Sequence, residues 1–191
     1  MISLFQLLIE LKTSSTVLIE DSPYLDVECI RVLKERIYVS KVKREIEVSF
    51  FTYDGEGDLP AGFFHFERGI YLNVKKLHDW EASEQDVQYV LCHEYWHWLQ
   101  ALNGFPFRGE ATPEEIEYYT RSLPSWEAGE YLTEDPSEMG AELFCALLGY
   151  RKSYFNSISN GAVDLLLKDF YNSVVMSNEL YKEEWERMNT I

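Results

Sequence analysis

The pattern of apolar and polar residues changes its period along the chain, and each period predicts a different element. Over 45–51, apolar and polar side chains alternate, which predicts a strand with one buried face. Two short β-prone runs, 62–66 and 70–74, flank a glycine-containing turn at 67–69 and predict a hairpin. We therefore expect three antiparallel strands, followed by a connection over 75–82.

Helical spacing predicts most of the remaining elements. An Asp-Ser-Pro start and apolar residues at helical intervals predict a supporting helix over 21–37. The same kind of pattern predicts a short helix over 113–121, a helix that opens at 135 and ends near 149, and helical structure over 162–187. For 1–20 the pattern fits a strand and the end of a helix equally well.

The most regular helical pattern covers 86–102. With His93 as the zero of a helical wheel, the apolar residues of this stretch fall between about 120° and 240°. They are Val87, Leu91, Tyr95, Trp98, Leu99 and Leu102. Within about 40° of His93 lie Asp86, Tyr89, His97 and Gln100. Ser83 is a suitable N-cap and Asn103-Gly104 a suitable stop, so we predict a helix with an apolar back and a polar front.

The polar front of this predicted helix carries the motif H-E-x-x-H, formed by His93, Glu94 and His97. Residues four apart on a helix lie one turn apart on the same face, so both imidazoles can reach one zinc ion at about 2.0–2.1 Å. Glu94 is turned about 100° from His93, which suits contact with a water at the metal better than ligation. The motif therefore predicts a zinc site with Glu94 as general base.

A catalytic zinc needs a third protein ligand and an open position. The longer three-histidine form of the motif is absent, because Gln100 and Asn103 stand where it has glycine and histidine. A carboxylate from a later helix is the better candidate, and we predict Glu138. Glu142 lies four residues further on, where it would accept the outward N–H of one of the histidines and fix its tautomer.

Alternatives to this ligand set stay open. Asp135 as N-cap and Glu138 at the third helical position also fit a capping box, which explains Glu138 without any metal. Glu142 is the substitute ligand if the assignment is one helical turn off, and Glu134 is a more distant one. His65 on the hairpin is the remaining histidine candidate.

Length and composition indicate one globular domain. At 191 residues, with 46% hydrophobic and 15% aromatic residues, the chain is long and apolar enough to bury a core. We expect a single domain over 1–191, made of an N-terminal extension 1–44, a core 45–150 and a C-terminal helical segment 151–191.

Charge and cysteine usage limit the partners and the compartment. The formal net charge is −16, from 33 acidic and 17 basic residues, which repels phosphate backbones and anionic membrane surfaces. The three cysteines are far apart and set among apolar residues, as is typical of reduced, buried thiols. The N-terminus has no pattern of a secretory signal. We therefore expect a cytoplasmic protein that binds neither nucleic acid nor membrane, in an oligomeric state that the sequence does not indicate.

Three segments together resemble a known family. They are the hairpin run 62–73, the H-E-x-x-H motif followed by Gln100, and the run 138–146, which reads E-x-x-A-E-x-F-C-A. They resemble zincin-like metallopeptidases with a glutamate third ligand, and in particular the small intracellular ones often carried by phages and mobile elements. Two departures are Glu142, where Asn or Asp is common, and the roughly 40 residues between His97 and Glu138.

This resemblance implies an α+β, zincin-like fold, in which a small antiparallel sheet with a hairpin packs on the H-E-x-x-H helix and further helices follow. It implies Zn²⁺ bound by His93, His97 and Glu138, with Glu94 as general base. It also implies a substrate peptide that adds as a strand along the hairpin edge.

The leading functional hypothesis is therefore zinc-dependent hydrolysis of a peptide or protein substrate, with the oxyanion stabilised by a further donor such as Tyr118, Tyr119 or Arg121. One alternative is a catalytically inactive zincin-fold protein that acts as a protein-binding module, with a structural or vestigial metal. Another is hydrolysis of a bond other than a peptide, because such a motif defines a reaction better than a substrate.

Overall fold

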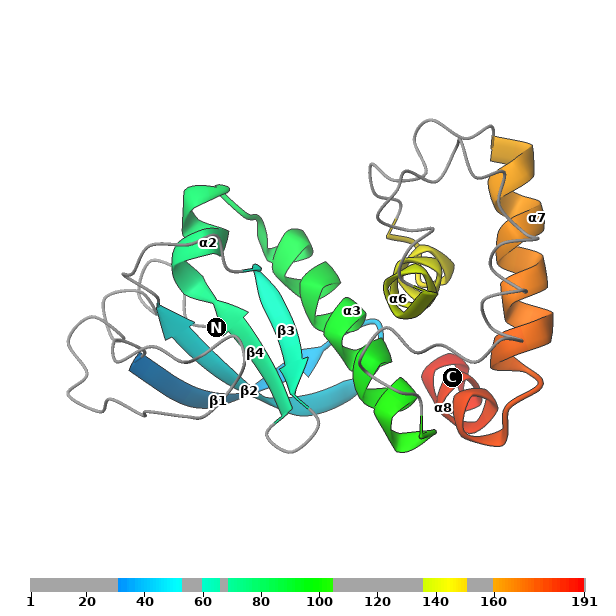
Figure 1. Ribbon diagram of the computed structural model, residues 1–191, viewed down its shortest axis with the longest axis horizontal. Coiled ribbons are helices and arrows are strands. Elements are labelled where there is room, and N and C mark those ends of the chain that lie inside the picture. The colour runs from blue at the N-terminus through cyan, green and yellow to red at the C-terminus, as the bar shows by residue number, and fades with distance from the viewer. Residues whose placement is uncertain (1–30, 53–59, 66–68, 105–135, 151–159, 191) are drawn as a thin grey trace. The chain divides into compact units, whose positions relative to one another are not determined.

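A computed structural model describes residues 31–52, 60–65, 69–104, 136–150 and 160–190. The strands are β1 (Arg31–Val39), β2 (Arg44–Thr52), β3 (Gly62–His65) and β4 (Gly69–Asn73). The helices are α2 (Val74–Asp79), α3 (Glu84–Leu102), α6 (Pro136–Leu147), α7 (Asn160–Phe170), a π-helical turn η2 (Tyr171–Val175) and α8 (Glu179–Asn189) (Figure 1). The predictions for 1–20 and for a helix over 113–121 lie outside the described residues.

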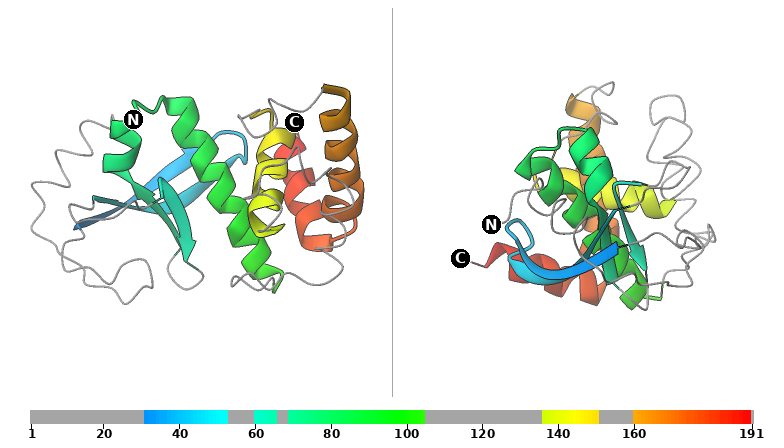
Figure 2. Two further views of the ribbon diagram at one scale, coloured as in Figure 1. Left: turned by 45° about the horizontal axis from the view of Figure 1, so that its top comes forward. Right: turned by 90° about the vertical axis from the view of Figure 1, so that its left-hand side faces the viewer.

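The chain divides into two compact units, Met1–Glu94 and Tyr95–Ile191, and the boundary falls inside the continuous helix α3. The first unit contains the sheet, α2 and the first half of α3. The second contains the rest of α3 together with α6, α7, η2 and α8, of which α6, α7 and α8 lie side by side (Figure 2). None of the helices that the structure describes is long and apolar enough to cross a membrane.

The sheet of the first unit has the strand order β1-β2-β4-β3. β1 and β2 are antiparallel, as are β3 and β4, but β2 and β4 run parallel. The predicted α+β class and the hairpin are confirmed, whereas the prediction of a wholly antiparallel sheet is wrong. The physical reason lies in β4, whose Ile70, Tyr71 and Leu72 are at most 2% exposed. A strand that is buried on both faces takes an inner position, so the hairpin presents β4 rather than β3 to β2.

The first strand corrects a second prediction. We expected helix over 21–37, but the part of this stretch that the structure describes belongs to β1, which pairs with β2 through Leu33 opposite Phe50 and Ile37 opposite Ile46. Apolar residues four positions apart lie on the same face both in a helix, after about one turn, and in a strand, after two full alternations. This spacing alone therefore does not distinguish a helix from a strand. Exposure alternates along β1, which is the period of a strand.

The predicted connection after β4 contains a short helix, α2. Asn73 ends the strand in an extended conformation, and its side chain accepts a hydrogen bond from the backbone N–H of Lys76. This is N-capping, the usual way in which asparagine starts a helix. Val74 and Leu77 are completely buried, so α2 contributes to the core of the first unit.

The first half of α3 is fastened to the turn between β1 and β2. Ser40 donates its backbone N–H to Oε1 of Gln88 at 3.0 Å, and Gln88 donates its side-chain N–H to the carbonyl of Tyr38 at 3.2 Å.

The predicted ends of α3 are confirmed. Ser83 and Asp86 hydrogen-bond to each other at the start, and Gly104 adopts a φ of +78° after the end.

The second half of α3 packs through Trp96, which is 1% exposed and lay outside the predicted apolar stripe. Its ring centroid lies 4.8 Å from that of Phe144, 5.4 Å from that of Phe170 and 4.5 Å from that of Tyr181.

The predicted apolar stripe of α3 is confirmed at Leu91, Tyr95 and Leu99, all at most 1% exposed, and wrong at Leu102, which is 56% exposed. The predicted polar front is also buried at Tyr89, His97 and Gln100.

A polar cluster joins α8 to α3 in the second unit. The hydroxyl of Tyr95 donates to Oε2 of Glu184 at 2.5 Å, and the guanidinium of Arg187 binds the same oxygen at 2.7 and 3.1 Å. Partial burial opposes the charge of the guanidinium, but the hydrogen bonds to Glu184 and the charge of that carboxylate raise the pKa of Arg187 above its ordinary value. The cluster therefore holds α8 against the helix that carries both histidines of the motif.

Candidate metal centre

The two histidines of the motif lie one turn apart on α3, as predicted. The helix is continuous from Glu84 to Leu102, so its regular geometry places both imidazoles on one face. His93 is half-buried and His97 is 5% exposed. The face that carries them thus lies largely out of bulk solvent, where a ligand side chain keeps its position better than at an exposed surface.

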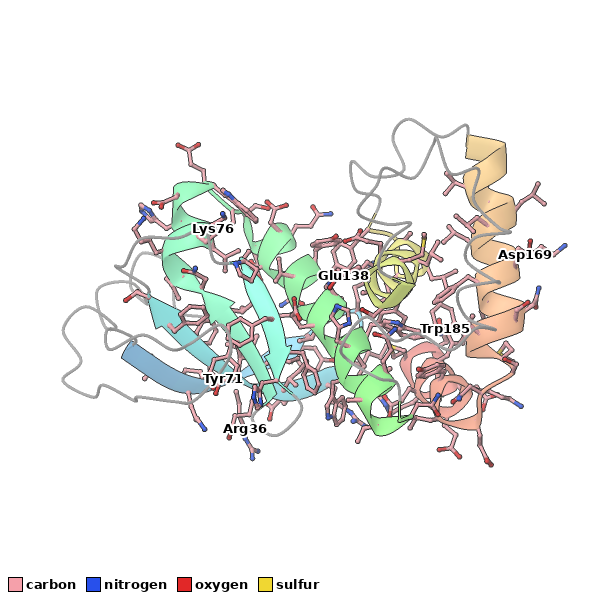
Figure 3. All side chains as sticks on the ribbon, in the orientation of Figure 1. Arg36, Tyr71, Lys76, Glu138, Asp169 and Trp185 are labelled. Atoms are coloured by element: carbon pink, nitrogen blue, oxygen red, sulfur yellow. The ribbon has the colours of Figure 1, made fainter. Side chains whose placement is uncertain are left out.

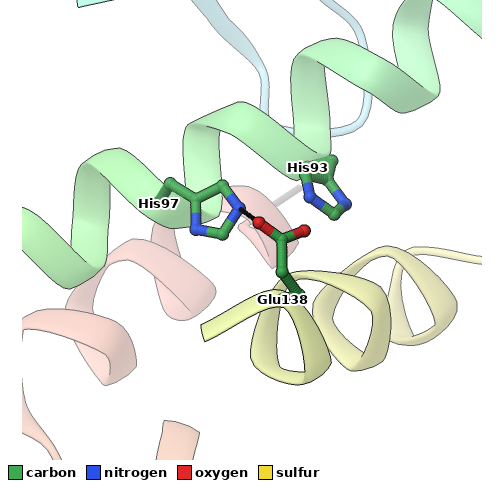
Figure 4. A group of neighbouring side chains, drawn as sticks. All are labelled: His93, His97 and Glu138. Carbon is green, nitrogen blue, oxygen red and sulfur yellow. Dashed lines mark ion pairs between the residues drawn. The ribbon is translucent and has the colours of Figure 1, made fainter. Parts of the chain in front are cut away.

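Glu138 comes to these histidines from the first turn of α6. Its carboxylate oxygen Oε1 lies 3.4 Å from Nε2 of His97 (Figure 4). Figure 3 shows the Glu138 side chain extending from α6 toward α3. Ligand atoms of His93, His97 and Glu138 all lie within 4.8 Å of one another. The first-choice ligand set is therefore brought together in space.

This donor set fits a metal ion. Ligands held at about 2.0–2.2 Å from a tetrahedral zinc are separated from one another by roughly 3.4 Å. The distance of 3.4 Å between Nε2 of His97 and Oε1 of Glu138 already equals this separation. The other ligand atoms lie up to 4.8 Å apart, and small side-chain rotations can bring them to the same separation. Two imidazoles and a carboxylate are ligands for divalent transition metals, zinc among them. The group could therefore hold such an ion, whose identity the geometry leaves open.

Of the alternatives for the third ligand, two lie within the described residues and the others lie outside them. His65 is the last residue of β3 and Glu142 lies within α6, and neither belongs to the group that could hold a metal. Glu134, and Asp135 as the proposed cap of α6, lie outside the described residues. So do Tyr118, Tyr119 and Arg121, the candidate donors to the oxyanion.

A second interaction of His97 was missed in the sequence. Its Nδ1 lies 2.9 Å from Oε1 of Gln100, which is 2% exposed. Nδ1 of His97 thus faces Gln100, a partner that the sequence analysis did not name, and the predicted role of Glu142 stays a prediction. The sequence did contain a signal for this contact, because Gln100 follows His97 by three residues and side chains three apart on a helix are neighbours.

Glu94 lies against the beginning of β3. Its carboxylate is buried, and a Cβ added to Gly62 would come within 3.2 Å of its Oε1. The same Cβ would come within 2.5 Å of Cγ1 of Val90, so only glycine lets the strand approach the helix this closely. The motif glutamate is therefore held between α3 and the strand at the edge of the sheet.

We expect Gly62→Ala to destabilise the protein by about 1–3 kcal/mol, because the methyl group must displace Val90 and the carboxylate of Glu94. Urea unfolding followed by circular dichroism measures the effect. Gly161→Ala is the matched control, because nothing lies within 4 Å of a Cβ there and alanine favours the helix α7. Equal stability of Gly62→Ala and wild type would show that this contact does not constrain the strand.

Comparison of the chain with protein-family models, with curated proteins and with solved structures finds no match. The resemblance to zincin-like metallopeptidases therefore stays a prediction from the three segments that carry it. The case for a function depends on the arrangement of His93, His97 and Glu138, and on Glu94 beside them.

Proposed function

We propose that the protein is a zinc-dependent metallopeptidase with a zincin-like fold. His93, His97 and Glu138 are the metal ligands and Glu94 is the general base. The observation that supports this most strongly is the distance of 3.4 Å between Nε2 of His97 and Oε1 of Glu138. These atoms come from residues about 40 positions apart on two helices, and the carboxylate approaches the ring nitrogen that does not face Gln100.

Three protein ligands suit a catalytic centre better than a structural one, because they leave one coordination position open. A bound zinc ion supplies Lewis acidity, which lowers the pKa of a water toward 7 and polarises the scissile carbonyl. His93 and His97 would hold the ion through imidazole nitrogens, and the carboxylate of Glu138 would offset part of its charge.

Glu94 moves the proton in this proposal. Its carboxylate takes a proton from the attacking water as the new C–O bond forms, and then gives it to the amine nitrogen as the C–N bond breaks. Burial to 5% exposure places this carboxylate where its interactions with charge are stronger than in bulk water. Its place one residue after His93 is the one that the motif gives to the base.

The position of β3 suggests how a peptide substrate binds. Among the strands that the structure describes, β3 lies at an edge of the sheet, and it begins at Gly62, next to Glu94. An extended peptide adds to such an edge through backbone hydrogen bonds, with little dependence on its sequence. A peptide paired with β3 would therefore pass the general base.

The proposal is tested by loading the purified protein with zinc, counting the bound metal and assaying cleavage of a mixed peptide library by mass spectrometry. We expect one zinc per chain, cleavage that a chelator abolishes and added zinc restores, and a zinc-bound protein that is more stable. At zinc concentrations 1,000 times the dissociation constant this stabilisation is about 4 kcal/mol. A zinc-loaded protein that cleaves no peptide in the library would contradict the proposed activity.

A second candidate function is a protein-binding module of the same fold with a structural metal. The burial of His97 and Glu94, each 5% exposed, favours it, because a structural site does not need access for a substrate. This candidate also binds one zinc per chain but cleaves nothing, and its partner binding does not depend on Glu94.

A further inference from the structure

The amide of Gln100 lies between two parts of the candidate metal centre. Its Oε1 is 2.9 Å from Nδ1 of His97, and its Nε2 is 3.4 Å from the backbone carbonyl oxygen of Ser137. Ser137 directly precedes Glu138 in the first turn of α6. One buried side chain therefore contacts an imidazole of the centre and the backbone next to its carboxylate.

The chemistry of these three groups allows one arrangement of hydrogens. A backbone carbonyl only accepts hydrogen bonds, so the amide must present its N–H₂ to Ser137. The amide oxygen of Gln100 then faces His97 and needs a donor, which requires a proton on Nδ1. In a neutral imidazole with this proton, the lone pair is on Nε2, the atom that lies 3.4 Å from Glu138.

We propose that Gln100 is a positioning residue of the metal centre, which directs the Nε2 lone pair of His97 toward the metal and ties the first turn of α6 to α3. This inference rests on the proposed metal site and adds to it the control of ligand tautomer and spacing. Gln100 touches no substrate and acts through His97 and Ser137. Its burial to 2% exposure excludes competing water from the amide.

The test compares Gln100→Met with Gln100→Glu. Methionine keeps the length of the side chain and removes both hydrogen bonds, whereas glutamate keeps an oxygen that accepts from Nδ1 and loses the donor to Ser137. We expect zinc affinity, measured by competition with a chromogenic chelator, to fall about 10-fold to 100-fold in Gln100→Met. Gln100→Glu should restore it to within a few-fold of wild type, because a carboxylate also orients a metal-binding imidazole.

Gln88→Met is the matched control for a loss of stability alone. Gln88 is a second glutamine of α3, 9% exposed, and it also bridges two partners, the backbone N–H of Ser40 and the carbonyl of Tyr38. Neither partner is a candidate ligand. We expect Gln88→Met to lower the Tm of the metal-free protein and to leave zinc affinity unchanged.

Each outcome decides between the claims. Loss of affinity in Gln100→Met with rescue in Gln100→Glu and no loss in Gln88→Met supports the positioning role. Equal affinity of Gln100→Met and wild type overturns it, as does equal loss in both Gln100 variants or in Gln88→Met. A wild-type protein that binds no zinc contradicts the proposed function itself, and the positioning role falls with it.

Discussion

Glu94→Gln is expected to reduce peptide hydrolysis by about 10²-fold to 10⁴-fold while the protein still binds one zinc ion per chain. The amide has the shape of the carboxylate, so the packing of this side chain against Gly62 is retained. It does not accept the proton of the attacking water, and the reaction loses its base. The measurements are kcat/KM on a cleaved peptide and the zinc content of the purified variant.

Glu84→Gln is the matched control for this variant. Glu84 is an exposed glutamate in the first turn of the same helix, so its substitution makes the same chemical change away from the centre. We expect hydrolysis at the wild-type rate. If Glu94→Gln also cleaves at the wild-type rate, Glu94 is not the base and the proposed mechanism is wrong.

Glu138→Gln is expected to weaken zinc binding roughly 100-fold to 1,000-fold. Zinc in small structural sites is bound with about 10–16 kcal/mol from four ligands, so one ligand contributes about 2.5–4 kcal/mol. A neutral amide is a poor ligand and does not offset the charge of the ion. The measurement is the zinc dissociation constant from chelator competition.

Glu179→Gln controls for the other effect of Glu138, which is the presence of a negative charge in the first turn of a helix. Glu179 occupies that turn in α8 and is exposed. Loss of such a charge costs about 0.3–1 kcal/mol of stability and no metal affinity. A Glu138→Gln variant that behaves like Glu179→Gln would show that Glu138 only stabilises its own helix.

The parts of the fold that the sequence predicted correctly are those with a strong local signal. The helix α3 has both caps and a regular apolar spacing, and the first half of β2 alternates between partly buried and exposed residues. The prediction of one buried face is wrong for the second half of β2, because every residue from Val48 to Thr52 is at most 3% exposed. The parallel pairing of β2 with β4 was not predictable in this way, because it depends on which strand of the hairpin faces β2. Burial on both faces of β4, which decides it, is a property of the folded sheet.

In the candidate site, too, the residues with a local sequence signal were predictable and those that depend on the folded structure were not. His93, His97 and Glu94 form a motif within five residues, and Glu138 could be anticipated because a catalytic zinc needs a third ligand and a carboxylate on a later helix can supply it. The role of Gln100 depends on the carbonyl of Ser137, which a sequence does not place. The need for glycine at position 62 likewise depends on how closely β3 approaches Val90.

The most direct test of the central claim is a crystal structure of the zinc-loaded protein with anomalous data collected on both sides of the zinc absorption edge. We predict one anomalous peak per chain, bonded at about 2.0–2.2 Å to Nε2 of His97, to His93 and to the carboxylate of Glu138. A peak elsewhere, or a Glu138 carboxylate turned away from both imidazoles, would contradict the metal centre on which the proposed function depends.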